Sequence, residues 1–504
     1  MMNLPFSSSY LALLPIIIPL TGAMVALIFF GRPKVQGAWS LGTVLVSLAV
    51  SVWLLWVVQS TGEAVVYQSG GWVAPFGIVL IADPLSALFV VMTQIVIATG
   101  VLYSIGSKDS VVTYPFYYTL FLTLAVGLTG AFLTGDLFNM FVFAELLVIS
   151  GAALTASSDN RYGTEAAYKY FYISLMAATF MLLSVGSLYV SYGTLNMADL
   201  SLQISSRPDG LLLLPAVGFL LATFMIKSAV IPFHFWQPDF HAAAPTAVSA
   251  MLSSIVVKLG IYGFLRMTTL LFLDQAPLIR TILIVMGIVG IIYGGLSAIA
   301  TYDAKRMLAY STLAQLGFIL VGIGWGTTLS ITAAIVFAFN HSLVKSAMLM
   351  LAGYVASRGA VKSAAFEVIT GVGKNLPVGG VLFFLGSLSL AGIPPTNGFI
   401  SKTLLFSSGI QSEHYLTLAV IGLASILTLI YTMRAFQRIW WVIPEEGGKA
   451  KSTGDRILAP AILIALVLAF GIWAEPLVSF AGQITEWLAD PSLYIEAIEL
   501  ASGG

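Results

Sequence analysis

Four lysines and one glutamate lie inside or beside long apolar stretches of this sequence, where charged side chains are rare. The lysines are Lys227, Lys258, Lys345 and Lys402, and the acid is Glu145. A charge at the centre of a lipid bilayer costs at least about 2.5–3.5 kcal/mol. Burial also disfavours the charged form of a lysine, so a buried lysine can take up and release a proton. These residues therefore predict a buried path for protons or cations.

Glu145 is surrounded by apolar neighbours. An unpaired carboxylate in such a place would be protonated, whereas a nearby lysine would keep it charged. One interpretation is a structural ion pair that holds two helices together. We favour a functional role, because one acid faces several lysines and a pair needs only one. For Lys227 a further alternative is open: it lies close to a helix end, from which its ammonium group could reach the membrane interface.

His341 and Lys345 are four residues apart, so they share one face of a helix. A histidine one turn from an intramembrane lysine is a candidate proton relay. Lys258 lies thirteen residues after Pro245 and eight before Arg266. At about 1.5 Å of helix rise per residue, this spacing places Lys258 near the middle of a membrane span. Lys258 is therefore the lysine that a structural role explains least well.

The composition indicates a membrane protein with little material outside the bilayer. Of the 504 residues, 59% are hydrophobic and 9% are charged, whereas soluble domains carry about 25% charged residues. Lys plus Arg number 22 and Asp plus Glu number 22, so no net charge favours nucleic acid. The chain has no cysteine, and its His234 and His241 are not spaced as a helical zinc pair. We expect no cofactor and no metal site.

Fourteen segments are apolar and long enough to cross a bilayer, which takes roughly 20 residues. We therefore predict an all-α polytopic membrane protein. Its helices are expected at 10–30, 39–58, 79–104, 114–133, 136–156, 165–190, 211–232, 245–266, 279–300, 306–324, 329–355, 378–408, 415–436 and 457–478. The first segment is interpreted as a helix and not as a cleaved signal, because no basic residue precedes it. The longest polar connections are 191–210 and 437–456.

Two of these segments are expected to be broken. Pro232 follows shortly after Lys227 in the seventh segment, and Pro394 and Pro395 interrupt the twelfth. Proline removes a backbone donor and clashes with the preceding helical turn. Non-helical backbone at membrane depth persists only where protein covers it or where it lines a wet cavity. Breaks five helices apart are typical of two inverted five-helix repeats, here 114–266 and 279–436.

The basic residues predict an orientation. Fifteen of them lie in loops that follow odd-numbered segments, whereas Arg207, Arg266 and Arg280 lie on the opposite side. The positive-inside rule places the side with fifteen basic residues in the cytoplasm. Both termini are then expected outside.

Several charged residues have a simpler interpretation. Asp83 and Asp136 each come close to the start of a predicted helix and are interpreted as caps. Asp303, Lys305 and Arg306 are interpreted as a helix-start acid with a cytoplasmic basic anchor.

The same residues carry a family pattern. The run 232–252, followed by Lys258-Leu-Gly-Ile-Tyr262, closely resembles the proton-translocating core of the antiporter-like subunits of complex I. The runs 303–317, 340–345 and 392–402 are similar to further motifs of that family. Within it, the segment 70–83, the chain length and the helix count resemble the D-type subunits of Mrp-type multisubunit sodium/proton antiporters.

The resemblance implies a proton path and a set of partners. It implies that Glu145 stabilises charged Lys227, that Lys258 is the central relay and that Lys402 is the terminal lysine. His341 or Lys345 lies between the last two, and protons are expected to enter near the first break. The chain would then be a secondary transporter subunit and not an enzyme. It would lie in the plasma membrane of a prokaryote, with protons, Na⁺ and other membrane subunits as partners.

The implied regions are N-terminal helices in 1–113, a proton-translocating core in 114–436, and a cytoplasmic loop, last helix and C-terminal tail in 437–504. Two other functions stay open. One is a proton-pumping subunit of a redox complex of the complex I or membrane-bound hydrogenase type. The other is a structural subunit whose buried charges only hold helices together, which is a poor use of five charges because apolar packing serves as well.

Overall fold

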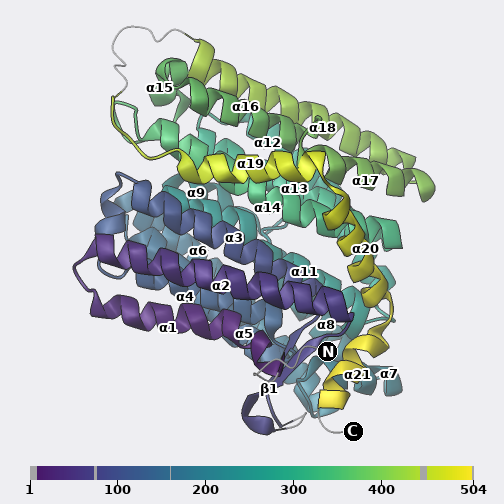
Figure 1. Ribbon diagram of the computed structural model, residues 1–504. Coiled ribbons are helices and arrows are strands. Elements are labelled where there is room, and N and C mark those ends of the chain that lie inside the picture. Colours follow the sequence, from purple (N-terminus) through teal and green to yellow (C-terminus); the bar gives the residue numbers. More distant parts are fainter. Residues whose placement is uncertain (1–7, 73–75, 159, 443–450, 502–504) are drawn as a thin grey trace.

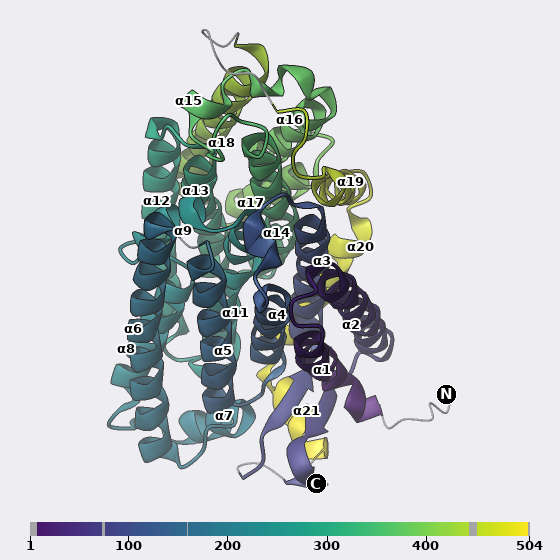
Figure 2. The ribbon, with the colours of Figure 1, turned by 90° about the vertical axis from the view of Figure 1, so that its left-hand side faces the viewer.

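The computed structural model describes residues 8–72, 76–158, 160–442 and 451–501. It is a bundle of long helices packed side by side (Figure 1, Figure 2). One short antiparallel pair of strands accompanies them, β1 (Val65–Gln68) and β2 (Val79–Ala82), with Val65 opposite Ala82. The predicted all-α membrane fold is confirmed.

The first half of the chain forms one side of the bundle. Its helices are α1 (Leu14–Ile28), α2 (Pro33–Thr61), α3 (Pro84–Gly106), α4 (Tyr117–Leu133), α5 (Leu137–Ala156), α6 (Arg161–Tyr192), α7 (Met197–Ser206), α8 (Leu213–Lys227) and α9 (Trp236–Ala243), with short 3-10 turns η1 (Ser8–Ala12), η2 (Ser69–Gly71) and η3 (Ser110–Thr113). α3 is buried along almost its whole length, whereas much of α2 faces outward. α7 was not predicted, and it lies inside the connection expected at 191–210.

Asp83 and Asp136 fix the starts of α3 and α5. The helix expected from residue 79 begins only at Pro84, because residues 79–82 pair as β2 and Asp83 caps the helix. Oδ1 of Asp83 accepts a hydrogen bond from Ser86 N at 2.8 Å. Oδ1 of Asp136 accepts one from Asn139 N at 2.7 Å. Both predicted caps are therefore confirmed.

A continuous buried helix occupies the centre of the bundle from Thr246 to Leu271. It consists of α10 (Thr246–Met251), the π-helical η4 (Leu252–Val256), α11 (Lys258–Arg266) and the π-helical η5 (Met267–Leu271). It is followed by α12 (Ala276–Ala300), α13 (Ala304–Trp325) and α14 (Thr328–Ala356). α14 is buried from Ser330 to Ala356, so polar side chains on it must find partners inside the protein.

The last part of the chain covers the other side of the bundle and returns at its end to β1 and α7 (Figure 1). Its elements are α15 (Phe366–Ile369), η6 (Val372–Asn375), α16 (Pro377–Ala391), α17 (Asn397–Gln411), α18 (Tyr415–Phe436), η7 (Gln437–Trp441), α19 (Leu458–Ile472), α20 (Glu475–Ala489) and α21 (Pro491–Ala501). Residues 443–450 of the predicted loop 437–456 lie outside the described residues.

The helix predicted at 457–478 is present but ends earlier, and the tail predicted after it is wrong. α19 ends at Ile472, and α20 continues at an angle of 76° to it (Figure 1). Pro476 lies in the first turn of α20, where a proline is favoured, and so fixes a new helix start. The residues expected as a tail form α20 and α21 instead.

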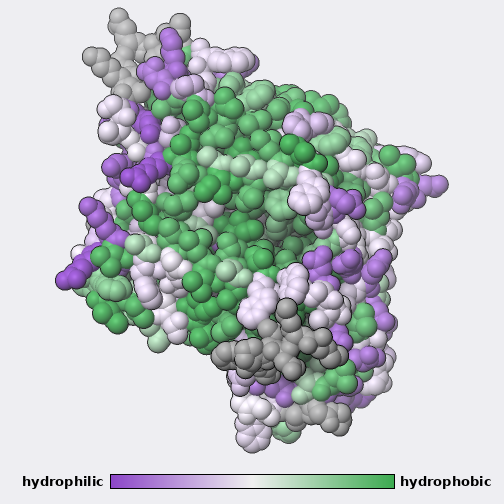
Figure 3. Space-filling view, viewed as in Figure 1, coloured by the Kyte–Doolittle hydropathy of each residue, from purple (hydrophilic) through white to green (hydrophobic). Residues whose placement is uncertain are grey.

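The helices present an apolar surface suited to a membrane. By length and composition, nine helices of the described residues could cross a bilayer, or ten if α19 and α20 form one span. α1, α4, α8 and α16 are shorter apolar helices. Every predicted segment overlaps a helix of this set, while the number of crossings and the inverted repeats stay predictions. Figure 3 shows the apolar surface as a broad band with hydrophilic residues towards its two ends.

Both predicted breaks are confirmed. α8 ends at Lys227 and α9 begins at Trp236, and α16 ends at Ala391 while α17 begins at Asn397. The second break is closely packed: a Cβ on Gly398 would lie 1.8 Å from Ser389 O, and a Cβ on Gly471 of α19 would lie 2.2 Å from Pro395 O. The bend of the C-terminal helices therefore starts against the second break.

Gly398→Ala should destabilise the protein, because the added methyl group clashes with backbone that cannot move freely. Overpacking of this kind costs about 1–3 kcal/mol. We expect a lower thermal midpoint of the purified protein. Gly186→Ala is the matched control, since a Cβ on Gly186 meets nothing within 4 Å. An unchanged midpoint for Gly398→Ala would contradict the close packing of the break.

Candidate functional site

The structure buries all four lysines of the predicted path, together with His341. They lie on helices that meet in the interior: Lys227 ends α8, Lys258 begins α11, Lys345 is on α14 and Lys402 is on α17. The two broken helices thus each contribute a lysine next to the break, and the two central helices contribute the others.

Lys227 and Glu145 form an ion pair between α8 and α5. Nζ of Lys227 lies 3.3 Å from Oε1 of Glu145, and the side chains are 5% and 20% exposed. The alternative in which Lys227 reaches the membrane interface is therefore wrong, because its ammonium group points to the acid. The pairing expected for these residues is present, and its part in transport stays a prediction.

Lys258 touches His341 directly. Nζ of Lys258 lies 2.5 Å from Nδ1 of His341, which joins the central helix to α14. An ammonium group only donates hydrogen bonds, so at least one of the two nitrogens must be neutral and accept. Nε2 of His341 is buried and has no hydrogen-bond partner among the described residues. The pair can thus share one proton and still has a free ring nitrogen.

Lys345 lies one turn after His341 on the same face of α14, and hydrogen bonds to α13 hold its side chain. Its Nζ donates to Ser311 Oγ at 2.8 Å and to Leu308 O at 3.2 Å, both on α13. The Tyr431 hydroxyl of α18 donates to the same Ser311 Oγ at 2.8 Å. Neither Ser311 nor Tyr431 was predicted, because hydroxyl residues are common in apolar helices and their spacing here carries no signal.

Lys402 satisfies the carbonyl groups that the second break leaves free. Its Nζ donates to Ala391 O at 2.9 Å, to Leu390 O at 3.1 Å and to Ser425 Oγ at 3.0 Å. The last carbonyls of a helix have no partner inside it and carry partial negative charge, so they favour a cation. Lys402 is therefore positioned by the end of α16.

A small cavity of about 10 Å³ connects the surroundings of His341 and Lys402. Its lining combines apolar residues such as Phe337 with polar ones that include Gln315, Asn340 and Ser401. This volume is about the minimum that one water molecule needs. No hydrogen bond or ion pair of the described residues joins Lys227 to Lys258, or Lys345 to Lys402, so a proton would need intermediate groups between them.

A much larger cavity, the vestibule, opens at the end of the bundle where α10 and α13 begin and α14 ends. Its volume is about 1010 Å³, and Thr246, Lys305 and Arg306 are among its lining residues. Lys305 is buried, and its Nζ donates to Ala244 O at 3.1 Å, directly after α9. The interpretation of Lys305 as a simple surface anchor is therefore wrong, whereas Asp303 caps α13 as predicted.

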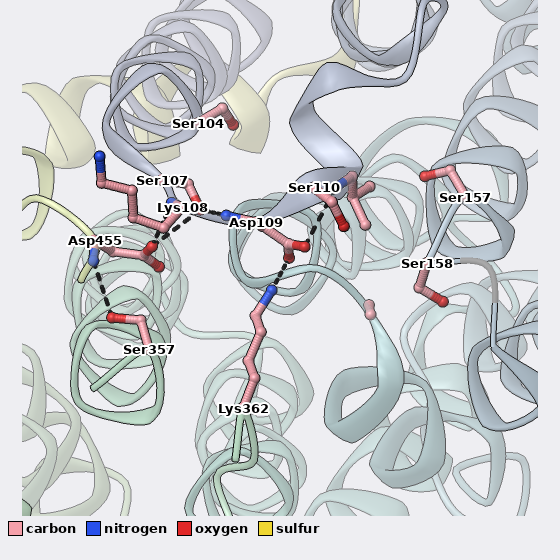
Figure 4. A network of polar contacts seen from close by, with 12 residues as sticks. Ser104, Ser107, Lys108, Asp109, Ser110, Ser157, Ser158, Ser357, Lys362 and Asp455 are labelled. Atoms are coloured by element: carbon pink, nitrogen blue, oxygen red, sulfur yellow. Dashed lines mark hydrogen bonds and ion pairs between the residues drawn. The ribbon is translucent and has the colours of Figure 1, made fainter. Parts of the chain in front are cut away.

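The rim of the vestibule is tied together by residues far apart in the sequence (Figure 4). Asp109 pairs with Lys362, which follows α14. Next to them, Asp455 accepts a hydrogen bond from Tyr103 Oη at 2.6 Å and one from Lys108 N at 2.7 Å. Loops that follow α3 and α14 and precede α19 are thereby fixed around the opening.

One buried ion pair was not predicted. Arg266 was predicted to end the helix 245–266 on the non-cytoplasmic side. It does end α11, but inside the protein, where it pairs with Asp83. The signal that could have revealed it is the spacing of Lys258, Tyr262 and Arg266, which are four residues apart in turn and so share one helix face.

Comparison with known proteins places these features in context. Residues 134–428 match the family model described as NADH:quinone oxidoreductase/Mrp antiporter, TM. The D-type subunit of the Na⁺/H⁺ antiporter of Alkalihalophilus pseudofirmus is 32% identical, over 97% of this chain and 99% of that protein. The N-type subunit of the NADH-quinone oxidoreductase of Desulforudis audaxviator is also 32% identical, over 95% of this chain and 97% of its own.

A solved structure shows a similar arrangement of helices. A chain in the structure of the Mrp complex from Dietzia sp. aligns with a TM-score of 0.89 at 26% identity, over 97% of this chain and 99% of that one. The similarity thus extends over nearly the whole chain, and the segment 134–428 contains all six candidate residues.

Proposed function

Because this chain belongs to the NADH:quinone oxidoreductase/Mrp antiporter family, we propose that it is a membrane subunit of a multisubunit Na⁺/H⁺ antiporter. A relative named as the D-type subunit of such an antiporter matches it almost from end to end. In this proposal the chain is a secondary transporter subunit, its partners are other membrane subunits, and protons are exchanged for Na⁺. Residues 114–436 form the translocating core.

The observation that carries the proposal is the direct Lys258–His341 contact in a row of buried basic side chains. Protons enter by the vestibule, beside the first broken helix, and pass by way of Lys227 to Lys258 and His341 in the centre. They pass on by Lys345 or by the small cavity next to His341 and leave at Lys402. Each step moves a proton between lysine and histidine side chains, which can be either protonated or neutral.

Glu145 and Lys227 are the coupling element of this scheme. The carboxylate stabilises charged Lys227, so moving it away or neutralising it weakens the hold of Lys227 on its proton. The 20% exposure of Glu145 leaves its carboxylate accessible to a neighbouring subunit or ion. A change at that surface would alter the charge of the interior, which is the coupling that exchange requires.

We place the vestibule on the cytoplasmic side of a prokaryotic plasma membrane. Lys108, Lys305, Arg306 and Lys362 lie at this end of the bundle, which supports the orientation through the positive-inside rule. Both termini then lie outside. Labelling of single cysteines introduced into this cysteine-free chain, with a reagent that does not cross membranes, tests the assignment.

A redox-driven proton pump is the second candidate function. It is favoured by the similarity to a relative named as a subunit of NADH-quinone oxidoreductase. In that case the same buried path would carry protons, and an electron-transfer partner would supply the energy.

Purification of the native complex and its reconstitution into vesicles decides between the two functions. We expect that adding Na⁺ alone collapses an imposed pH gradient, because exchange needs no electron donor. Matched vesicles that receive choline instead of Na⁺ serve as the control. Proton movement that requires both an electron donor and a quinone would contradict the antiporter proposal and establish the alternative.

A further inference from the structure

The buried Arg266–Asp83 ion pair lies at the end of the bundle opposite the vestibule. Thr246 lines the vestibule, and Arg266 lies about 30 Å further along the same continuous helix. Nη2 of Arg266 donates to Oδ2 of Asp83, which caps α3, and the two side chains are 2% and 0% exposed. Neither residue belongs to the proton path proposed above.

A row of polar side chains leads from the central lysine towards this ion pair. Lys258, Tyr262 and Arg266 lie on one face of α11, which is a regular α-helix over these residues. A proton on Lys258 therefore has a possible second way out of the membrane, along Tyr262 to the far end. An exchanger that allowed this route would let protons through without Na⁺.

The hydrogen bonds of Tyr262 end that route. Its hydroxyl donates to Phe132 O at 2.9 Å and accepts from Nε of Arg266 at 3.0 Å. Proton transfer along hydrogen bonds needs groups that both accept and donate. A guanidinium group only donates and keeps its charge, and a carbonyl oxygen only accepts, so neither can pass a proton on.

Aromatic rings fill the space around this point. The rings of Phe89 and Phe132 lie 5.8 and 5.2 Å from that of Tyr262. The guanidinium carbon of Arg266 lies 4.9 Å from the ring centres of both Tyr262 and Tyr494. Tyr494 belongs to α21, which lies beside β1 and α7 at this end (Figure 1, Figure 2).

We propose that Arg266, held by Asp83 and Tyr262, is a proton seal that closes the far end of the Lys258 site. The donor-only guanidinium and the acceptor-only carbonyl group of Phe132 interrupt the hydrogen-bond route at Tyr262. Protons on Lys258 can then leave only towards Lys402. This inference rests on the proposed function, because a seal matters only where Lys258 carries transported protons.

The double variant Asp83→Asn/Arg266→Gln tests the seal in the native complex, reconstituted into vesicles. Glutamine is shorter than arginine and leaves room for a water molecule, which both donates and accepts hydrogen bonds. The variant therefore opens the route without leaving a buried unpaired charge. In Na⁺-free medium we expect an imposed pH gradient to decay several-fold faster than in vesicles that contain the wild-type complex.

Two further variants separate a seal from a structural role. Asp83→Glu keeps both the donor-only guanidinium of Arg266 and a carboxylate to hold it, so its vesicles should stay as tight as those of the wild type. Adding Tyr262→Phe to the double variant removes the hydroxyl that completes the route and should restore tightness. A double variant without a leak, an equal leak in Asp83→Glu, or no rescue by Tyr262→Phe would each overturn the proposal.

Arg266→His covers the case in which the double variant does not assemble. This variant leaves Asp83 paired and replaces the guanidinium with an imidazole ring, which both donates and accepts hydrogen bonds. Vesicles that contain it should therefore leak protons. Vesicles as tight as those of the wild type would refute the seal. Na⁺-driven exchange by the wild type is measured in the same vesicles. Its absence would refute the proposed function, whereas intact wild-type exchange with tight variants would refute the seal alone.

Discussion

Replacing Lys258 with methionine should abolish Na⁺-driven proton exchange while leaving the protein folded. Methionine has a similar length but cannot hold a proton, and His341 loses the nitrogen that lies 2.5 Å away. Losing a positioned proton-transfer group typically slows a reaction about 100-fold or more. Exchange is measured as the Na⁺-dependent collapse of a pH gradient in vesicles that contain the assembled complex.

Thermal stability distinguishes this result from structural damage. Apolar residues often stabilise a protein as well as the buried charges they replace, so Lys258→Met should melt at or above the wild-type temperature. Lys374→Met, at an exposed position in η6, is the matched control and should transport normally. Full transport by Lys258→Met would support the view that the buried charges only hold helices together.

Glu145→Gln and Lys227→Met should each stop exchange, because each leaves one member of the ion pair without its partner. Breaking a buried pair costs about 3–5 kcal/mol, and the 20% exposure of Glu145 places this pair at the lower end. Transport and thermal midpoint are measured on the same preparations. Glu165→Gln is the matched control, since Glu165 forms an exposed ion pair with Lys169.

The double variant Glu145→Gln/Lys227→Met shows what the pair does. If the pair is a clamp, removing both charges restores stability and exchange together. If Lys227 carries protons, stability returns and exchange does not. We expect the second result, and wild-type exchange in the double variant would remove Lys227 and Glu145 from the mechanism.

The buried charges could be found from the sequence because the membrane makes them costly. Lys258 and Lys345 stand out in apolar runs, and the four-residue spacing of His341 and Lys345 places both on one face. The contact between Lys258 and His341 could not be predicted, because it depends on how α11 and α14 pack. The distance between residues on two helices depends on how the helices pack, and the local sequence of each helix does not show this.

Arg266 shows how a correct rule can miss the surroundings of a residue. The positive-inside count treats an arginine at the end of an apolar run as a surface charge. Here Asp83, 183 residues earlier in the chain, compensates the charge, so Arg266 is buried. The bend between α19 and α20 escaped detection for a related reason, since the second break, against which Gly471 packs, lies in another helix.

The rim of the vestibule can be completed only late in the biosynthesis of the protein. Tyr103 and Asp455, whose side chains meet at 2.6 Å, are separated by 352 residues. At about 5–20 residues per second, the ribosome needs roughly 20–70 s between them. Late in that interval the growing chain holds the lysines of α8, α11, α14 and α17 but still lacks the loop that fixes the opening. The entrance is therefore finished late in biosynthesis, after the path to which it leads.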